Sequence, residues 1–194
     1  TDKTMRKLLY LLLFVPGIVL SQEGFLTTSS ALQKYGDRLS NRSFMAFPEV
    51  RERPLIPIDG VPEKAIDNAL SGIPYTLVAN PGEYFVFQVG VWALHNTAPD
   101  IKVEFSSFAS KGRKSIAPSQ MTCFNTAGTD YTGRVFTKGT DVAEGKVQSL
   151  WIGVNLQGID RGEYTGKVTV NSKGTRQVIP VVLKVEGDAI PNHG

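Results

Sequence analysis

The side chains that most often carry out catalysis or bind metals are scarce in this sequence. Its 194 residues include two histidines, His95 and His193, and a single cysteine, Cys123. A tetrahedral zinc site built from histidine and cysteine needs about four such ligands, and a disulfide within the chain needs a second cysteine. The sequence therefore excludes both, and it predicts no cofactor and no metal site.

Nucleophilic catalysis finds little support either. A serine nucleophile needs a base that is itself held by a third group, and only His95 could be that base because His193 is next to the last residue. No G-x-S-x-G motif is present. We expect His95 to be a loop histidine after a strand. We expect Cys123, between Thr122 and Phe124, to be a small buried side chain rather than a nucleophile.

Glycoside hydrolysis requires two carboxyl groups on either side of the sugar bond. The chain has 18 acidic residues, but none lies in an apolar segment that would raise its pKa, and no Asp stands next to a Glu. The charged residues 49–53 are expected to be solvated. Several other acids lie in predicted turns: Asp59, Asp100, Asp160 and Asp188. No catalytic pair is predicted.

Two tryptophans are the candidate ligand-binding residues. Trp151 lies on the face of its predicted strand opposite the aliphatic row, and Trp92 lies on the mixed face of another strand. Exposed tryptophans at these positions would form a stacking platform for a carbohydrate. The alternative is that both pack in the core or at a domain interface.

The N-terminus has the pattern of a secretory signal. Arg6 and Lys7 precede an apolar run of about 13 residues, which is too short to span a bilayer as a helix. Val19 and Ser21 stand at the minus-three and minus-one positions of a cut before Gln22. We predict a signal peptide over residues 1–21, with an anchor helix as the alternative. The product is expected in the periplasm or outside the cell, without a stable membrane span.

The net charge argues against a polyanionic partner. The formal net charge is +3, and residues 1–21 contribute +2 of it, so the product without the signal has a net charge of +1. A protein that binds nucleic acid through its charge carries a pronounced basic patch. We therefore predict no nucleic-acid partner.

Two segments precede the main fold. Residues 22–44 are polar and weakly periodic, which indicates a lead-in or linker. A short helix is predicted from Glu63 to Leu70, because Pro62 can stand in its first turn and Gly72 can end it.

The rest of the chain alternates apolar and polar side chains in the manner of β-strands. In residues 83–94 one face is purely apolar and should point to the core, and the other is mixed and should be covered only in part. Further strands are predicted at residues 101–105, 146–156, 162–170 and 177–185. Pro180 predicts that the last strand lies at a sheet edge or carries a bulge. Strands divided by turns with little helix indicate an all-β fold, an antiparallel Ig-like or jelly-roll-like β-sandwich over residues 45–188.

These strands and the turns between them carry a family resemblance. The segments GEYFVFQVGVWA, CFNTAG, YTG, VQSLWIGV and GEYTGKVTV follow one another at residues 82–93, 123–128, 131–133, 147–154 and 162–170. In this order they resemble the N-terminal β-sandwich domain of glycoside hydrolase family 123, over residues 45–194. Residues 189–194 resemble the start of the linker to the catalytic barrel of that family.

The resemblance implies a parent enzyme of the β-N-acetylgalactosaminidase type. Its barrel would carry an adjacent Asp-Glu pair for substrate-assisted hydrolysis, and this chain contains neither the barrel nor the pair. The resemblance therefore implies a non-catalytic domain whose partner is that barrel. An exposed apolar patch would dock the barrel, and the mixed faces with Trp92 and Trp151 are the candidates. The alternative is an independent module that binds glycans or sits on the cell surface.

Overall fold

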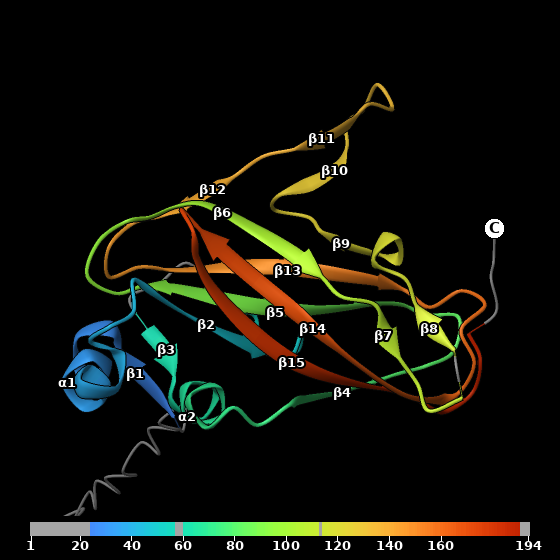
Figure 1. Cartoon of the computed structure of the whole chain (residues 1–194), viewed down its shortest axis with the longest axis horizontal. Coiled ribbons are helices and arrows are strands. Elements are labelled where there is room, and N and C mark those ends of the chain that lie inside the picture. The colour runs from blue at the N-terminus through green and yellow to red at the C-terminus, as the bar shows by residue number, and fades with distance from the viewer. Residues whose placement is uncertain (1–23, 57–59, 113, 191–194) are drawn as a thin grey trace, which may run out of the picture.

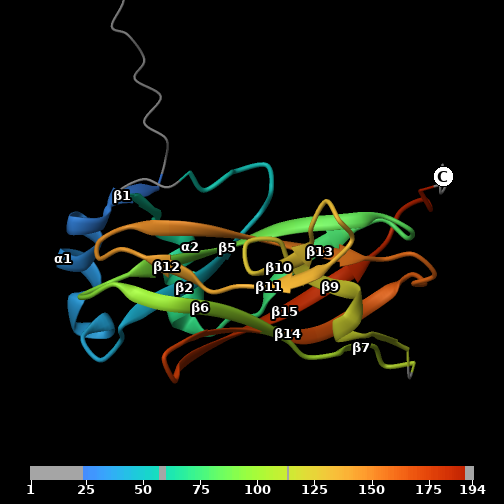
Figure 2. The same cartoon turned by 90° about the horizontal axis from the view of Figure 1, so that it is seen from above.

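The computed structural model, which describes residues 24–56, 60–112 and 114–190, is built on two stacked β-sheets (Figures 1 and 2). One sheet has four strands in the order β2 (Phe44–Glu49), β5 (Tyr84–Ala93), β13 (Val147–Asn155) and β9 (Met121–Cys123). The other has the order β12 (Thr140–Val142), β6 (Ala98–Phe105), β14 (Gly162–Ser172), β15 (Thr175–Val185) and β4 (Tyr75–Ala79). In addition, β7 (Phe108–Ala109) pairs with β14, and β8 (Ser115–Ile116) pairs with β7. Neighbouring strands are antiparallel except β15 and β4. The predicted all-β sandwich is confirmed.

The main core lies between the two sheets. The purely apolar face of β5 points into it, and it is buried from Phe85 to Ala93. Leu150, Ile152 and Val154 of β13 face it from the neighbouring strand. Because side chains alternate along a strand, the same residues that gave the sequence its period of two form this interior.

A second core covers one end of the outer face of the four-stranded sheet. It is formed by the helices α1 (Thr28–Leu39) and α2 (Glu63–Ser71) with the strand pair β1 (Phe25–Thr27) and β3 (Gly60–Pro62). Met45, Phe47 and Trp92 of the sheet lie beneath them. In Figure 2, α1 lies at one end of the molecule and the C-terminal segment at the other. The mixed face of β5 is therefore covered in part, as predicted.

The lead-in predicted for residues 22–44 is wrong for most of that range. Residues 25–44 form β1, α1 and the first residue of β2. The hydroxyl of Thr27 accepts a hydrogen bond from the backbone N–H of Ser30 at 3.1 Å and caps α1. Ala31, Tyr35 and Leu39 are buried at a spacing of four residues. This narrow apolar stripe has only one buried apolar residue per turn. The other residues of α1 are mostly polar, which is why the segment was predicted to be a linker.

The predicted short helix is confirmed as α2. Pro62 precedes its first residue, and Gly72 follows its last with a positive φ of 68°. Glycine adopts this left-handed conformation without the steric cost that a Cβ imposes, which is why the helix ends there.

Pro180 lies at a local edge of the sheet, which is one of the two predicted alternatives, and no bulge is present. The strand β15 pairs with β14 without a break in register and with β4 on its other side. Pro180 is opposite Lys167, whose backbone N–H and C=O both bond to Ser106 at 2.9 and 3.0 Å. The nitrogen of Pro180 therefore points away from β14, and β4 begins one residue later, opposite Val181. No ladder bond is lost.

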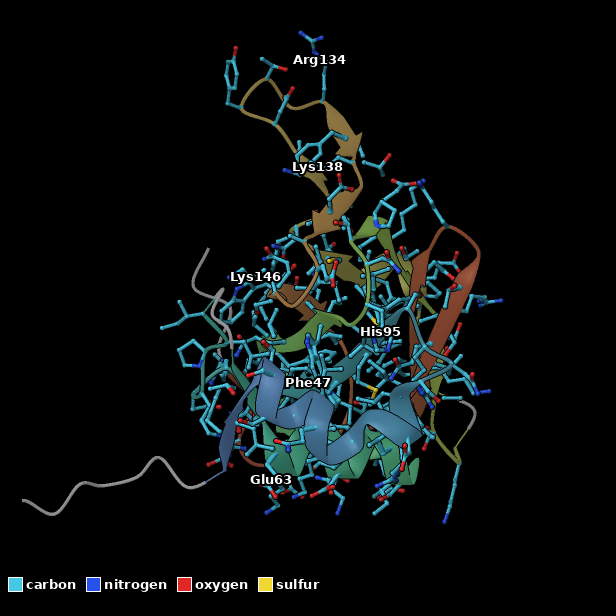
Figure 3. All side chains as sticks on the ribbon, turned by 90° about the vertical axis from the view of Figure 1, so that its left-hand side faces the viewer. Phe47, Glu63, His95, Arg134, Lys138 and Lys146 are labelled. Atoms are coloured by element: carbon cyan, nitrogen blue, oxygen red, sulfur yellow. The ribbon has the colours of Figure 1, made fainter. Side chains whose placement is uncertain are left out.

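A hairpin projects from the body beyond β9. It consists of β10 (Ala127–Thr129) and β11 (Val135–Thr137), and it follows the 3₁₀-helix Pro118–Gln120 and β9 in the chain. Figures 1 and 3 show it standing clear of both sheets, with Arg134 near its tip. A carboxylate oxygen of Asp130 accepts hydrogen bonds from the backbone N–H groups of Thr132 and Arg134 at 2.8 and 3.0 Å, which orders the turn.

Several predictions fall on residues that the structure does not describe. The signal over residues 1–21, Asp59, His193 and residues 191–194 of the predicted linker lie outside the described residues. Within the described part of the chain, no helix is long and apolar enough to cross a membrane.

Candidate functional site

The two candidate tryptophans have different environments. Trp92 is 0% exposed and belongs to the core beneath the helices. It therefore packs in the core, and the structure contradicts the alternative that it contacts a carbohydrate. Trp151 is half-buried on the open end of the same sheet face, so its role as a ligand contact stays a prediction.

The remaining candidates for chemistry lie apart. His95 is exposed in the turn after β5, as predicted (Figure 3). Cys123 is buried, and burial raises the pKa of its thiol, which fits an inert side chain. Among the described residues there is no group of three His, Cys, Asp or Glu side chains that could hold a metal ion.

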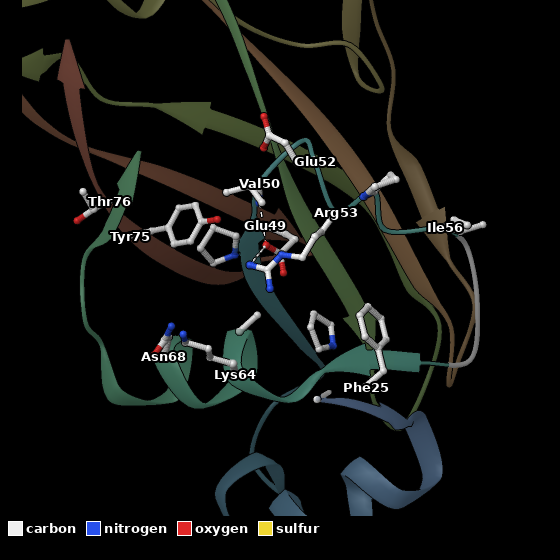
Figure 4. Close-up of a pocket in the computed structure, with 15 residues that line it drawn as sticks. Phe25, Glu49, Val50, Glu52, Arg53, Ile56, Lys64, Asn68, Tyr75 and Thr76 are labelled. Atoms are coloured by element: carbon white, nitrogen blue, oxygen red, sulfur yellow. Dashed lines mark hydrogen bonds and ion pairs between the residues drawn. The ribbon is translucent and has the colours of Figure 1, made fainter. Parts of the chain in front are cut away.

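A pocket of about 710 Å³ opens where the end of β2, the loop after it, α2 and the start of β4 meet (Figure 4). Polar and charged side chains from each of these elements line it together with apolar ones. They are Phe25, Pro48, Glu49, Val50, Glu52, Arg53, Pro54, Ile56, Pro62, Lys64, Ala65, Asn68, Tyr75 and Thr76, with Gly24 beside them.

The central polar residue of the pocket is Glu49. Its side chain is only about 4% exposed, and its Oε1 accepts a hydrogen bond from the backbone N–H of Val50 at 2.9 Å. A guanidinium nitrogen of Arg53 lies 2.8 Å from the same oxygen. The prediction that the charged residues 49–53 are solvated is therefore wrong for Glu49. Its position on the outer face of β2 places it under α2 and the following loop.

The loop that carries Arg53 is held by Gln88, a fully buried side chain of β5. The amide oxygen of Gln88 accepts hydrogen bonds from the backbone N–H of Leu55 at 2.8 Å and from the hydroxyl of Ser149 at 2.9 Å. Its amide nitrogen donates to the backbone carbonyl of Val50 at 2.7 Å. Gln88 is thus a positioning residue for this wall of the pocket.

Two titratable groups near Glu49, namely Tyr75 and Glu52, have shifted pKa values. Burial, and next the charge of Glu49, raise the pKa of the half-buried Tyr75, so its phenol stays neutral. A hydrogen bond with its own backbone, and next the guanidinium of Arg51, lower the pKa of the exposed Glu52. A glycosidase needs one carboxylic acid held protonated, and Glu52 has the opposite perturbation.

An aromatic surface, defined as Tyr84, Phe124 and Trp151, occupies the end of the outer sheet face that the helices leave open. Tyr84 and Phe124 are 49% and 46% exposed, with ring centroids 6.2 Å apart. Both rings lie over Gly153, where a Cβ would come within 2.7 Å of each. The missing side chain at this position lets the two rings approach the backbone of the sheet closely.

The hairpin extends this exposed apolar area. It follows Phe124 directly in the chain, and Tyr131 at its tip is 100% exposed. Val135 and Phe136 are exposed on its second strand. Large apolar side chains on an arm that stands clear of the body are typical of a surface that meets a partner.

The sequence alone did not indicate the pocket. Its lining comes from four separate stretches of the chain, and the two partners of Glu49 given above, Val50 and Arg53, belong to the segment that was expected to be solvated. One signal was present: Gln88 is a polar residue in the middle of a strand that is otherwise apolar, and such a residue needs partners when it is buried.

Comparisons with known proteins show a similarity of fold. No protein-family model matches the chain, and no curated protein matches it. Among solved structures, a family 123 glycoside hydrolase from Clostridium perfringens, studied for its hydrolysis of glycolipid glycans, is similar with a TM-score of 0.56 and 12% sequence identity. The match covers 77% of this chain and 28% of that enzyme. The chain thus shares the fold of a part of a family 123 hydrolase.

Two smaller β-domains match with lower scores. A PapD-like domain of human CEP192 has a TM-score of 0.32 and 14% identity, covering 60% of this chain and 84% of that domain. The CooA pilin subunit of enterotoxigenic Escherichia coli has a TM-score of 0.29 and 11% identity, covering 59% of this chain and 92% of the pilin.

Proposed function

We propose that this chain is a non-catalytic β-sandwich domain of an exported glycoside hydrolase of the family 123 type, which acts on N-acetylgalactosaminides. In this role it packs against a catalytic barrel and supports it. The observation that carries the proposal is the shared fold with a family 123 hydrolase, in which the match takes up 28% of the enzyme. The order of the sequence segments that resemble the N-terminal domain of that family supports the same assignment.

The charge states in the pocket support the absence of catalysis in this domain. Glu49 already binds Arg53, and the pKa of Glu52 is lowered. A lowered pKa at Glu52 is the opposite of what a general acid needs. Hydrolysis would then be the work of the barrel.

The aromatic surface supports a docking role. Tyr84 and Phe124 are about half exposed on the outer sheet face. The projecting hairpin, whose Tyr131 is fully exposed, follows Phe124 in the chain. Contact with a folded barrel would remove this apolar area from water, at about 25 cal/mol for each Å² buried. We propose that this surface, at the Trp151 end of the mixed face, is where the barrel docks.

A direct test is to assay the full chain on an aryl N-acetyl-β-galactosaminide and to read the gene beyond codon 194. We expect no turnover above the uncatalysed rate and an open frame that encodes a barrel with an adjacent Asp-Glu pair. In the complete protein, replacing Tyr84 and Phe124 by alanine should separate the unfolding transitions of the two domains. Turnover by this chain alone, or a frame without a barrel, would overturn the proposal.

Export is tested separately. The apolar run before Ser21 supports a signal that is removed before Gln22. N-terminal sequencing of the protein secreted by its host should give Gln22 as the first residue. An intact N-terminus on a membrane-bound product would instead support the anchor helix.

A further inference from the structure

We infer that the pocket around Glu49 is a binding site for a neutral, polyhydroxylated ligand of the saccharide class. The pocket lies beside α2, whereas the aromatic surface lies at the open end of the sheet face. The inference stands without the proposed docking role, because it depends only on residues of this chain.

The size and shape of the pocket fit a small molecule. Its volume of about 710 Å³ falls within the range of roughly 300–1,000 Å³ that ligand sites commonly have. Its walls come from α2, β1, β4, the end of β2 and the loop after it (Figure 4). Gln88 anchors that loop from inside the sheet, so this wall is preformed.

The polar groups converge on the pocket from several sides. Within the described part of the chain, both contacts given above for Glu49 are made to its Oε1, which leaves Oε2 as the carboxylate oxygen that would accept hydrogen bonds from a ligand. Lys64 and Asn68 are four residues apart on α2 and lie on the side of the helix that faces Glu49 (Figure 4). The phenol of Tyr75 adds a neutral donor. Adjacent hydroxyl groups of a sugar are both donors and acceptors, and they match such a set.

Charge balance favours a neutral ligand. Glu49 and Glu52 contribute two negative charges to the lining, and Arg53 and Lys64 contribute two positive charges. An anion would approach the buried carboxylate of Glu49, and a cation would meet Arg53 in front of it. Removing an unpaired charge from water is costly, so the lining selects against both.

The apolar part of the lining fits the other face of a sugar. Phe25 and Tyr75 present aromatic rings, and Pro48, Pro54 and Pro62 present rigid apolar surface. A pyranose ring has a face of C–H groups that packs on such surfaces, while its hydroxyl edge reaches polar side chains. A purely hydrophobic ligand would leave Glu49 and Arg53 desolvated without new partners.

The experiment is a binding titration of the full chain with methyl β-galactoside, N-acetylgalactosamine and N-acetylglucosamine, followed by saturation-transfer NMR. Glucuronate and glucosamine serve as the charged comparison. We expect saturable binding of at least one neutral sugar, and weaker binding of both charged sugars. The variant Asn68→Ala should weaken binding about three- to tenfold, as expected for one lost hydrogen bond. Glu49→Gln should weaken it further.

The matched control is Tyr84→Ala, which alters the aromatic surface and leaves the pocket intact. Its affinity for the neutral sugars should equal that of the unaltered chain. The inference is overturned if no neutral sugar saturates the protein up to about 20 mM, a range in which a Kd of a few millimolar is measurable. It is also overturned if a charged sugar binds best, if Asn68→Ala has no effect, or if Tyr84→Ala abolishes binding. None of these results depends on the catalytic barrel.

Discussion

Replacing Gln88 by methionine tests whether this one buried amide holds the pocket wall in place. Methionine has nearly the same length and volume but can neither donate nor accept the four hydrogen bonds that Gln88 makes. Two of the groups left without a partner, the N–H of Leu55 and the hydroxyl of Ser149, are buried. The carbonyls of Val50 and Arg53 lie in a more exposed part of the loop and can turn to water.

The magnitude follows from the two buried groups. An unsatisfied buried polar group costs about 1–3 kcal/mol, and the hydroxyl of Ser149 can partly recover by rotation, so we expect a loss of about 2–4 kcal/mol in the free energy of unfolding. Urea unfolding followed by tryptophan fluorescence measures this loss. Hydrogen exchange should show in addition that the amide of Leu55 loses its protection.

The control is Gln148→Met on the neighbouring strand. The amide of Gln148 donates to the backbone carbonyl of Ser149 at 2.8 Å and is only half-buried. We expect its loss to cost less than about 1 kcal/mol. If Gln88→Met destabilises the protein no more than this control, or if the Leu55 amide stays protected, Gln88 does not position the loop.

Three further predictions concern packing, pH and the sheet edge. Gly166→Ala should lower the free energy of unfolding by about 1–3 kcal/mol or more, because the new Cβ would lie 1.9 Å from the buried ring of Phe108. Gly36→Ala in α1, where a Cβ meets nothing within 4 Å, should raise the free energy of unfolding by about 0.5–1 kcal/mol. Thermal unfolding of the two variants beside the unaltered chain measures both changes. Burial raises the pKa of the Cys123 thiol, so the stability that its neutral form contributes is present below pH 9 and is lost as the pH rises through the folded-state pKa. A disulfide reagent at pH 8 should therefore react with Cys123 only after the protein has been unfolded in urea. Gln177 donates to and accepts from the backbone of the edge strand β2 at 2.6 and 2.8 Å, so Gln177→Ala should cost about 1–3 kcal/mol in urea unfolding, and equal midpoints would refute the role.

The strands were predictable because their information is local. Along residues 83–94 every second side chain is apolar. Successive side chains of a strand point to opposite faces of the sheet, so these apolar residues share one face regardless of the rest of the fold. The helix α2 was predictable for a similar reason, since Pro62 and Gly72 mark its two ends through their own backbone preferences. The local edge at Pro180 was predictable from the residue itself, since proline cannot donate a ladder hydrogen bond and β4 begins only opposite Val181.

The environment of single polar residues was not predictable in this way. Glu49 stands in a run of charges that is typical of a solvated segment, and its burial depends on α2 and on a loop held by Gln88 from another strand. Trp92 and Trp151 looked alike in sequence, yet one is covered by the helices and the other is not. The difference is decided by the two helices that cover one end of this face, and the stripe of buried residues on α1 is too narrow to be recognised in the sequence.

The sequence by itself determined the strand faces, the short helix and the small number of histidines and cysteines. These properties belong to single residues or to their nearest neighbours. Only the tertiary structure decided which half of the outer sheet face is covered, and which carboxylate and amide side chains meet in a pocket. These are contacts between segments far apart in the chain, and their free energy depends on burial and charge that no single segment contains.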